Sequence, residues 1–250
     1  MRGEISTGRQ SKRHPLDWYV EQGWEWEQIA AAIGISCDIE DDIAYWDPAA
    51  GYGHMGSRLQ GIGFTGAVLL SDVVKNVAWS DFERPGAVQF SSIDFLYAEN
   101  DGARITDSEC IGEPLELPAS RRLSIWSNPP YSYKKVWYDG RQVSISEAFV
   151  RHALKLATDR VVMILPAKWL AMGKRRSRLV CVDYPPQFVL HFCERPSMPP
   201  GDMIEAMGGR AYRGGMVDYC AVVWDVRNPT EPGETRTIWL PPLGLTGGEQ

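Results

Sequence analysis

Three apolar segments in the first half of the chain each end at an acidic residue, and this repeated pattern constrains the fold more than any other feature. Residues 43–46 lead to Asp47, residues 67–70 lead to Asp72, and a third segment ends at Asp94. Strands that alternate with helices build an open α/β sheet, and ligands bind at the carboxyl ends of its strands. We therefore expect a Rossmann-like, seven-stranded, mostly parallel sheet with helices on both faces.

The first acid opens a turn of small residues, which reads Asp47-Pro48-Ala49-Ala50-Gly51-Tyr52-Gly53. Glycines in such a turn let a ligand approach the backbone, and the acid can accept a hydrogen bond from a hydroxyl or an ammonium group. Asp72 follows at about the distance along the chain where such folds place the acid that binds ribose. The turn alone is a weak signal, but with the acids it predicts a nucleoside-bearing ligand, with Asp94 and Phe95 near its adenine.

A second turn, Asn128-Pro129-Pro130-Tyr131, follows an apolar segment that we expect to be a buried strand. The prolines remove backbone donors and fix φ, so the Asn128 amide and the adjacent carbonyl groups are held at a strand end. The Asn128 oxygen and a proline carbonyl can each accept one hydrogen of an exocyclic amine, and the Tyr131 ring can stack on the heterocycle. Accepting both hydrogens directs the nitrogen lone pair at an electrophile. The same four residues also fit an ordinary turn between a strand and a helix.

The composition fits one globular domain over residues 1–250, with no linker that would separate a second domain. No apolar run reaches membrane-spanning length and the N-terminus lacks the apolar core of a signal peptide, so we expect a cytoplasmic protein. The five cysteines and four histidines are scattered, which predicts neither disulfides nor a metal site. The net charge of −6 argues against an extended nucleic-acid surface but is compatible with a local basic patch.

The remaining segments are assigned from the periodicity of their apolar residues and from the glycines and prolines that interrupt helices and strands. Residues 1–13 are expected to form a loose tail, residues 97–121 a long loop, and residues 226–250 an irregular extension with one short strand. Helices are expected over residues 17–34, 54–60 and 146–158, and further strands over 160–165, 187–192 and 219–224, with antiparallel pairing at one edge. A basic cluster, residues 174–178, is expected to open another helix.

In this order, the Asp47 turn, Asp72, the Asp94-Phe95 pair and the Asn128 turn resemble the S-adenosylmethionine-dependent adenine-N6 DNA methyltransferases. The chain is most similar to small members of that family from phages and prophages, and the likeness extends from about residue 17 to residue 225. The resemblance implies the class I methyltransferase fold, S-adenosylmethionine as cofactor, and a location in the host cytoplasm if a phage encodes the protein. It also implies direct in-line transfer of the methyl group to an adenine that is flipped out of DNA.

The resemblance assigns roles to individual residues. The catalytic turn comprises Asn128, Pro129, Pro130 and Tyr131, and the cofactor-binding residues are Trp18, Tyr19, Asp47, Pro48, Ala49, Gly51, Gly53, Asp72, Asp94, Phe95 and Asn128. Trp18 and Tyr19 belong to a segment that relatives usually continue with Thr-Pro, whereas this chain continues with Val20-Glu21-Gln22. That departure leaves the contacts of this segment to the methionine end of the cofactor open.

The DNA partner would be met by basic side chains beyond the catalytic turn. The candidates are Lys134, Lys135, Lys174, Arg175 and Arg176, although the last three also fit a solvated helix face. Target recognition would come from residues 97–121, 132–145 or 196–216, and no obligate protein partner is indicated.

Other functions remain open at this point. The same fold and turn also serve amines of RNA and glutamine side chains of proteins, while cytosine-N4 enzymes more often carry serine in the place of Asn128. A catalytically silent cofactor-binding accessory protein is a further alternative. No cysteine stands in a Pro-Cys turn, which argues against cytosine-C5 chemistry.

Overall fold

The computed structural model describes residues 17–35, 42–64, 66–74, 88–108, 112–118, 121–132, 134–171 and 173–245. The predicted loose tail, residues 1–13, lies outside these residues, as does part of the predicted extension at 246–250.

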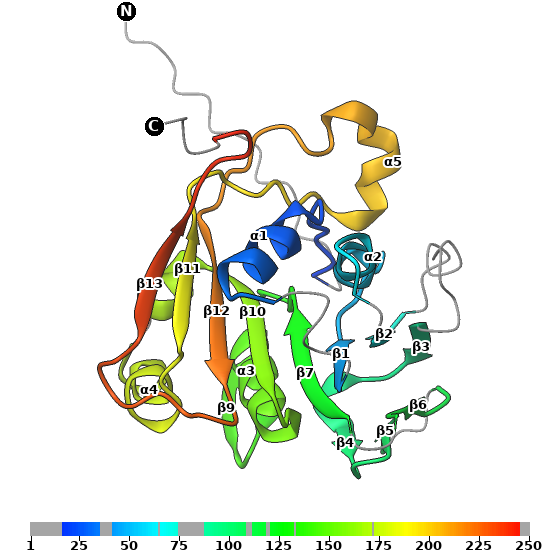
Figure 1. Ribbon diagram of the computed structural model, residues 1–250, viewed down its shortest axis with the longest axis vertical. Coiled ribbons are helices and arrows are strands. Elements are labelled where there is room, and N and C mark those ends of the chain that lie inside the picture. The colour runs from blue at the N-terminus through cyan, green and yellow to red at the C-terminus, as the bar shows by residue number, and fades with distance from the viewer. Residues whose placement is uncertain are drawn as a thin grey trace, which may run out of the picture.

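Among the described residues, eight strands join in one sheet in the order β13-β11-β12-β10-β7-β1-β2-β3. They are β1 (Ile43–Asp47), β2 (Ala67–Asp72), β3 (Val88–Ser92), β7 (Arg122–Ser127), β10 (Arg160–Pro166), β11 (Phe188–Phe192), β12 (Tyr219–Asp225) and β13 (Arg236–Leu240). All neighbouring pairs are parallel except those of β12, which runs antiparallel to β10 and β11. The arrowheads in Figure 1 show β12 running opposite to β11. The predicted mostly parallel α/β sheet is therefore confirmed.

The eighth strand corrects the prediction of an irregular extension. β13 pairs with β11 over five residues, from Arg236 to Leu240, and the Leu240 side chain is buried in the core. The sequence indicates a short strand here, but polar and glycine-rich flanks hide its membership in the main sheet. Residues 226–245 therefore include a structural edge of the sheet.

Helices cover both faces of the sheet. On one face, α1 (Trp24–Ala32) and α2 (His54–Gly61) bury side chains such as Trp26 and Met55. On the other face, α3 (Ile145–Leu156) and the helical turn Leu179–Asp183 bury side chains such as Phe149 and Leu179. The turn continues α4 (Gly173–Arg178), which is the predicted basic helix. Figure 1 shows α1 and α2 together near one end of the strands.

Two helix starts differ from the sequence prediction. α3 begins at Ile145, because Ser144 rather than Ser146 caps it and its hydroxyl accepts a hydrogen bond from the Glu147 N–H at 3.3 Å. α1 begins only at Trp24, because Gly23 adopts a left-handed conformation with φ of 100°. Residues 17–22, here called the N-terminal strap, are not helical, and Tyr19 forms an isolated antiparallel bridge with Pro200.

The segment predicted as a long loop contains a small antiparallel sheet. It contains β4 (Ala98–Asn100), β5 (Arg104–Asp107) and β6 (Leu115–Glu116), and the side chains of Ile105 and Leu115 are fully buried. Strands of two to four residues are too short to show a recognisable alternation, which explains the wrong prediction.

A hairpin follows the Asn128 turn, in the 132–145 segment that was considered for target recognition. β8 (Lys135–Tyr138) pairs with β9 (Arg141–Ser144) through a two-residue turn whose residues, Asp139 and Gly140, have φ of 49° and 70°. An Asp-Gly pair between two strands is a strong hairpin signal, so this element was recognisable from the sequence.

Within the described residues, no helix combines the length and the apolar character that crossing a bilayer requires.

Candidate active site at the carboxyl ends of β1 and β7

The order of the strands reverses between β1 and β7. From β1 the chain proceeds outward to β2 and β3, and it then returns to β7 on the other side of β1. In open α/β sheets such a reversal opens a crevice at the carboxyl ends of the two strands, where ligands bind. Asp47 ends β1, and Asn128 follows the end of β7, so the topology brings the two predicted turns together.

Asp47 links the two strands. Its side chain is 2% exposed, and Oδ1 accepts hydrogen bonds from Ser127 Oγ at 2.9 Å and from the Ala49 N–H at 3.1 Å. Burial, and then the negative charge of Glu21, raise the pKa of Asp47 well above its usual value. The sequence did not single out Ser127 or Glu21, because neither belongs to a recognisable pattern.

The glycine turn after β1 is fastened to the end of β2. The Gly51 N–H donates to Asp72 Oδ2 at 3.0 Å, and burial raises the pKa of that carboxyl group. Gly51 and Gly53 have φ of 51° and 80°, which favours glycine at both positions. A Cβ atom at Gly51 would lie 3.0 Å from the Trp18 indole nitrogen. The turn therefore presents a bare backbone surface beside an aromatic ring.

The N-terminal strap holds Trp18 over this turn. The Trp18 carbonyl accepts from the Gly201 N–H at 3.1 Å, and the Val20 N–H donates to the Pro199 carbonyl at 3.0 Å. The Trp18 ring lies 5.2 Å from the Tyr52 ring and packs on the Gly201 backbone, where a Cβ atom would clash with it. The segment at Pro199 and Gly201, about 180 residues further along the chain, therefore holds the predicted residues Trp18 and Tyr19 at the crevice.

The Asn128 side chain is 9% exposed and fully engaged in the crevice. Its Nδ2 donates to Glu21 Oε2 at 2.8 Å and to the Tyr19 carbonyl at 3.1 Å. Its Oδ1 contacts the Tyr131 hydroxyl, which also lies 2.8 Å from the Ile164 carbonyl. The amide nitrogen therefore faces the strap, and the amide oxygen faces Tyr131.

Asp94 and Phe95 stand at the end of β3 with different surroundings. Asp94 Oδ1 accepts from the Leu96 N–H at 3.1 Å and caps the short turn Phe95–Tyr97. The Phe95 ring is 1% exposed and lies within 5.2 Å of the rings of Trp46, Phe149 and His152. The structure thus gives Phe95 a packing role, and a direct contact of its ring with an adenine stays a prediction.

A small pocket of about 130 Å³ adjoins the Asn128 turn, and sequence reasoning missed it. Three aromatic rings line it, from Tyr131, Trp169 and Tyr219, and the rings of Tyr131 and Tyr219 lie 5.7 Å apart. Hydroxyl and cationic groups complete the lining: Ser132, Ser144, Ser146, Lys168 and Arg176. Trp169 follows β10 and Tyr219 begins the antiparallel β12, so both reach the same edge of the sheet as Asn128.

The predicted DNA-contacting residues do not form one exposed group. Lys134, Lys135 and Lys174 are exposed, whereas the side chain of Arg175 lies outside the described part of the structure. Arg176 is 6% exposed, its guanidinium lies 4.7 Å above the Trp169 ring, and it donates to Ser144 Oγ at 3.0 Å. The expectation that Arg176 belongs to a solvated or phosphate-facing surface is therefore wrong, because this side chain forms a wall of the small pocket.

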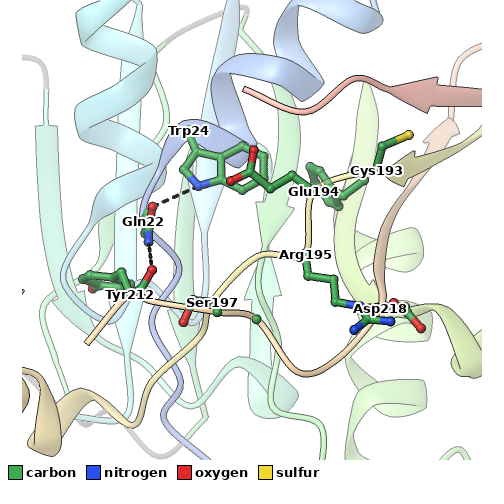
Figure 2. Close-up of a pocket in the computed structure, with 11 residues that line it drawn as sticks. Gln22, Trp24, Cys193, Glu194, Arg195, Ser197, Tyr212 and Asp218 are labelled. Carbon is green, nitrogen blue, oxygen red and sulfur yellow. Dashed lines mark hydrogen bonds and ion pairs between the residues drawn. The ribbon is translucent and has the colours of Figure 1, made fainter. Parts of the chain in front are cut away.

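A larger hollow of about 570 Å³ lies to the side of the crevice, between the start of α1 and the segment after β11. Figure 2 shows Gln22 joined to Trp24 and Tyr212, with Arg195 and Asp218 at the opposite wall. Arg195 and Asp218 form an ion pair at 2.7 Å. The predicted catalytic and cofactor-binding residues do not line this hollow, but its wall includes part of the 196–216 segment that was considered for target recognition.

The described part of the chain contains no group of three or more His, Cys, Asp or Glu side chains that could hold a metal ion.

Comparisons with known proteins bear on the fold. No protein-family model matches the sequence, and no curated protein matches it either. The methyltransferase subunit of a type I restriction-modification system from Streptococcus thermophilus aligns over 84% of this chain and 45% of its own, with a TM-score of 0.55 and 12% identity. A candidate class I S-adenosylmethionine-dependent methyltransferase from Listeria monocytogenes aligns over 87% and 64%, with a TM-score of 0.52 and 11% identity.

The likeness is one of architecture. A candidate hemolysin from Streptococcus thermophilus aligns over 86% of this chain and 70% of its own, with a TM-score of 0.50 and 14% identity. The chain spans less than two thirds of the length of both methyltransferases, and such low identities carry no activity from one protein to another. The chain has the class I methyltransferase fold, as the strand order, the antiparallel β12 and these alignments together establish.

Proposed function

We propose that this protein transfers the methyl group of S-adenosylmethionine to the exocyclic N6 amine of adenine in DNA. The observation that carries the proposal is the position of the Asn128 amide, which lies between the Asp47 crevice and an aromatic pocket bordered by Tyr131. A methyl donor in the crevice and a planar base in the pocket would meet at this amide.

The residues at the ends of β1 and β2 suit S-adenosylmethionine in chemistry and in charge. Gly51 lets the Trp18 ring lie close against the backbone of the turn, and Asp72 stands at the end of β2, where a ribose would lie. Asp47 and Glu21 supply negative charge for a ligand that carries a positive sulfonium and a positive ammonium group. A cation beside Asp47 would favour its ionised form. When bound, the cofactor supplies an electrophilic methyl group.

The Asn128 turn would hold the acceptor nitrogen. Asn128 Oδ1 and the Pro129 carbonyl can each accept one hydrogen of the amine, which directs the nitrogen lone pair at the methyl donor. The Tyr131 hydroxyl contacts Oδ1 in this structure, so the incoming amine has to replace it. No covalent intermediate on the enzyme is needed, because alignment of donor and acceptor carries the reaction.

The small pocket favours a nucleobase over a protein side chain. Three aromatic rings offer stacking surfaces that a planar heterocycle uses and a glutamine side chain does not. Exposed Lys134 and Lys135 lie on the strand segment directly after the catalytic turn and would contact the phosphate backbone of a flipped-out strand. Methyl transfer to adenine in RNA uses the same pocket and is the second outcome that an experiment has to separate.

The test uses radiolabelled S-adenosylmethionine with three substrates: duplex DNA, RNA and a protein extract treated with nucleases. We expect label in DNA, on the N6 position of adenine after digestion to nucleosides. Asn128→Ala should lower transfer by about a thousandfold, the scale seen when a single transition-state acceptor or donor is removed. The matched control is Asn228→Ala, which removes an exposed amide far from the crevice. Label confined to RNA or protein would refute the proposed substrate.

A further inference from the structure

We infer that Glu21 is a positioning residue, which sets the direction of the Asn128 amide so that its oxygen, and not its nitrogen, faces the substrate amine. The inference rests on the proposed function, and it assigns to the N-terminal strap a role in the methyl-transfer step itself. No sequence pattern points to it, because Glu21 lies 107 residues before its partner.

The buried Glu21 carboxylate accepts two hydrogen bonds, one from Asn128 and one from Trp26. Glu21 is 6% exposed, and its Oε2 accepts from Asn128 Nδ2 at 2.8 Å. Its other oxygen, Oε1, accepts from the Trp26 indole N–H at 3.0 Å, and that indole is fully buried in the first turn of α1. The Glu21 carboxylate is therefore fixed from one side by a rigid ring and bonded on the other side to the catalytic amide.

Only a group with two acceptor atoms satisfies both neighbours. The Trp26 indole nitrogen can donate but cannot accept, and the Asn128 nitrogen donates as well. A carboxylate accepts both bonds at once. A glutamine in its place has one oxygen and one NH₂ group, so either Trp26 or Asn128 would face another donor, and a buried donor without an acceptor is costly.

The carboxylate thereby selects one of the two orientations of the Asn128 side chain. Rotating the amide by half a turn would bring Oδ1 against Glu21 Oε2 and against the Tyr19 carbonyl, which are both acceptors. The orientation seen here directs Oδ1 to the Tyr131 hydroxyl, on the side of the aromatic pocket. A substrate amine, which donates hydrogens, finds an acceptor there.

The test is a double-mutant cycle of Glu21→Gln and Trp26→Phe, with methyl transfer measured at saturating cofactor. With Trp26 present, Glu21→Gln should lower kcat by about tenfold or more, the effect of one lost buried hydrogen bond. In the Trp26→Phe background, the glutamine oxygen is free to turn to Asn128, so Glu21→Gln should lower kcat by only about threefold or less. Thermal melting checks that all four proteins are folded.

Three results would overturn the inference. One is a Glu21→Gln variant with the kcat of the wild type, and another is an equal loss in both backgrounds. A loss that is confined to the dissociation constant of S-adenosylmethionine, measured by calorimetry, would also overturn it, because Glu21 would then act on the cofactor.

A second readout does not depend on turnover. The side-chain NH₂ group of Asn128, identified in nitrogen-labelled protein by its loss in Asn128→Ala, should exchange slowly with solvent in the wild type. It should exchange measurably faster in Glu21→Gln. If the wild type methylates none of the substrates, the proposed function fails, and this exchange measurement alone then decides whether Glu21 holds the amide.

Discussion

Glu25 makes the stability of this protein depend on pH in an unusual direction. The side chain is fully buried in the first turn of α1, where its two oxygens accept from the Gly23 N–H at 2.8 Å and the Gln22 N–H at 3.4 Å. Burial, and then the negative charge of Glu21, raise the pKa of Glu25 from 4.5 to about 8. We predict that Glu25→Gln, which matches the protonated acid in shape and in carrying no charge, removes this dependence.

The sign follows from proton binding in the two states. Between pH 4.5 and 8, the folded state keeps the proton on Glu25 while the unfolded chain has released it. The free energy of unfolding therefore falls as the pH rises through this window, by up to about 1.4 kcal/mol per pH unit, and it levels off above the folded pKa. Across the whole window, the contribution of Glu25 amounts to at most about 4–5 kcal/mol.

The assay is urea unfolding of the wild type and Glu25→Gln at several pH values between 5.5 and 8.5. The variant should gain stability relative to the wild type as the pH rises, by roughly 2–4 kcal/mol between the two ends of this range. Glu27→Gln is the matched control, because Glu27 lies on the same helix but is 42% exposed and pairs with Arg58. Parallel stability curves for the wild type and Glu25→Gln would refute the reasoning.

Two further predictions concern the crevice and the pocket. Gly51→Ala introduces a side chain at a φ of 51° and a contact of 3.0 Å with the Trp18 ring, so calorimetry should show that S-adenosylmethionine binds about tenfold more weakly. Gly61→Ala is the control, because Gly61 is a helix position with open space around it, and this variant should bind the cofactor normally. Tyr131→Phe keeps the ring and removes the hydroxyl that contacts Asn128, so kcat/KM for DNA should be equal to or above that of the wild type. Tyr131→Ala removes the stacking surface as well, so KM for DNA should rise about five- to a hundredfold. Equal affinities in both glycine variants, or inactivity of Tyr131→Phe, would contradict these assignments.

Most of the main sheet was predictable because most of its strands carry their own signal. Strands buried on both faces are written as continuous apolar runs, and β1, β2 and β10 follow this rule, whereas β7 carries Ser124 among its buried residues. The acid or amide after such a run marks the carboxyl end of a strand, and in a parallel sheet these ends share one edge. That is why Asp47, Asp72 and Asn128 could be expected near one another before any coordinates were known.

The contacts across that edge could not be predicted, because they join residues without a shared pattern. Glu21 lies in the segment where the chain departs from the family that it resembles, and nothing in Val20-Glu21-Gln22 indicates a partner beyond β7. Trp169 and Tyr219 follow or begin strands that are far apart in sequence, and they meet only because β12 is antiparallel and lies next to β10. Arg176 was misplaced for a related reason, since a run of basic residues suggests a solvated face while one of its members turns inward.

The Asn128 turn shows how a blocked acceptor can still be ready for a substrate. In this structure the Tyr131 hydroxyl contacts Asn128 Oδ1, yet the same hydroxyl lies 2.8 Å from the Ile164 carbonyl on β10. A hydroxyl has one hydrogen to donate, and it can donate to either oxygen. When a substrate amine takes Asn128 Oδ1, the Tyr131 hydrogen can turn to Ile164, so the exchange leaves no buried donor without an acceptor. The Tyr131 ring then needs no large movement. The aromatic wall of the pocket stays in place while Asn128 Oδ1 exchanges the tyrosine hydroxyl for the substrate amine as its donor.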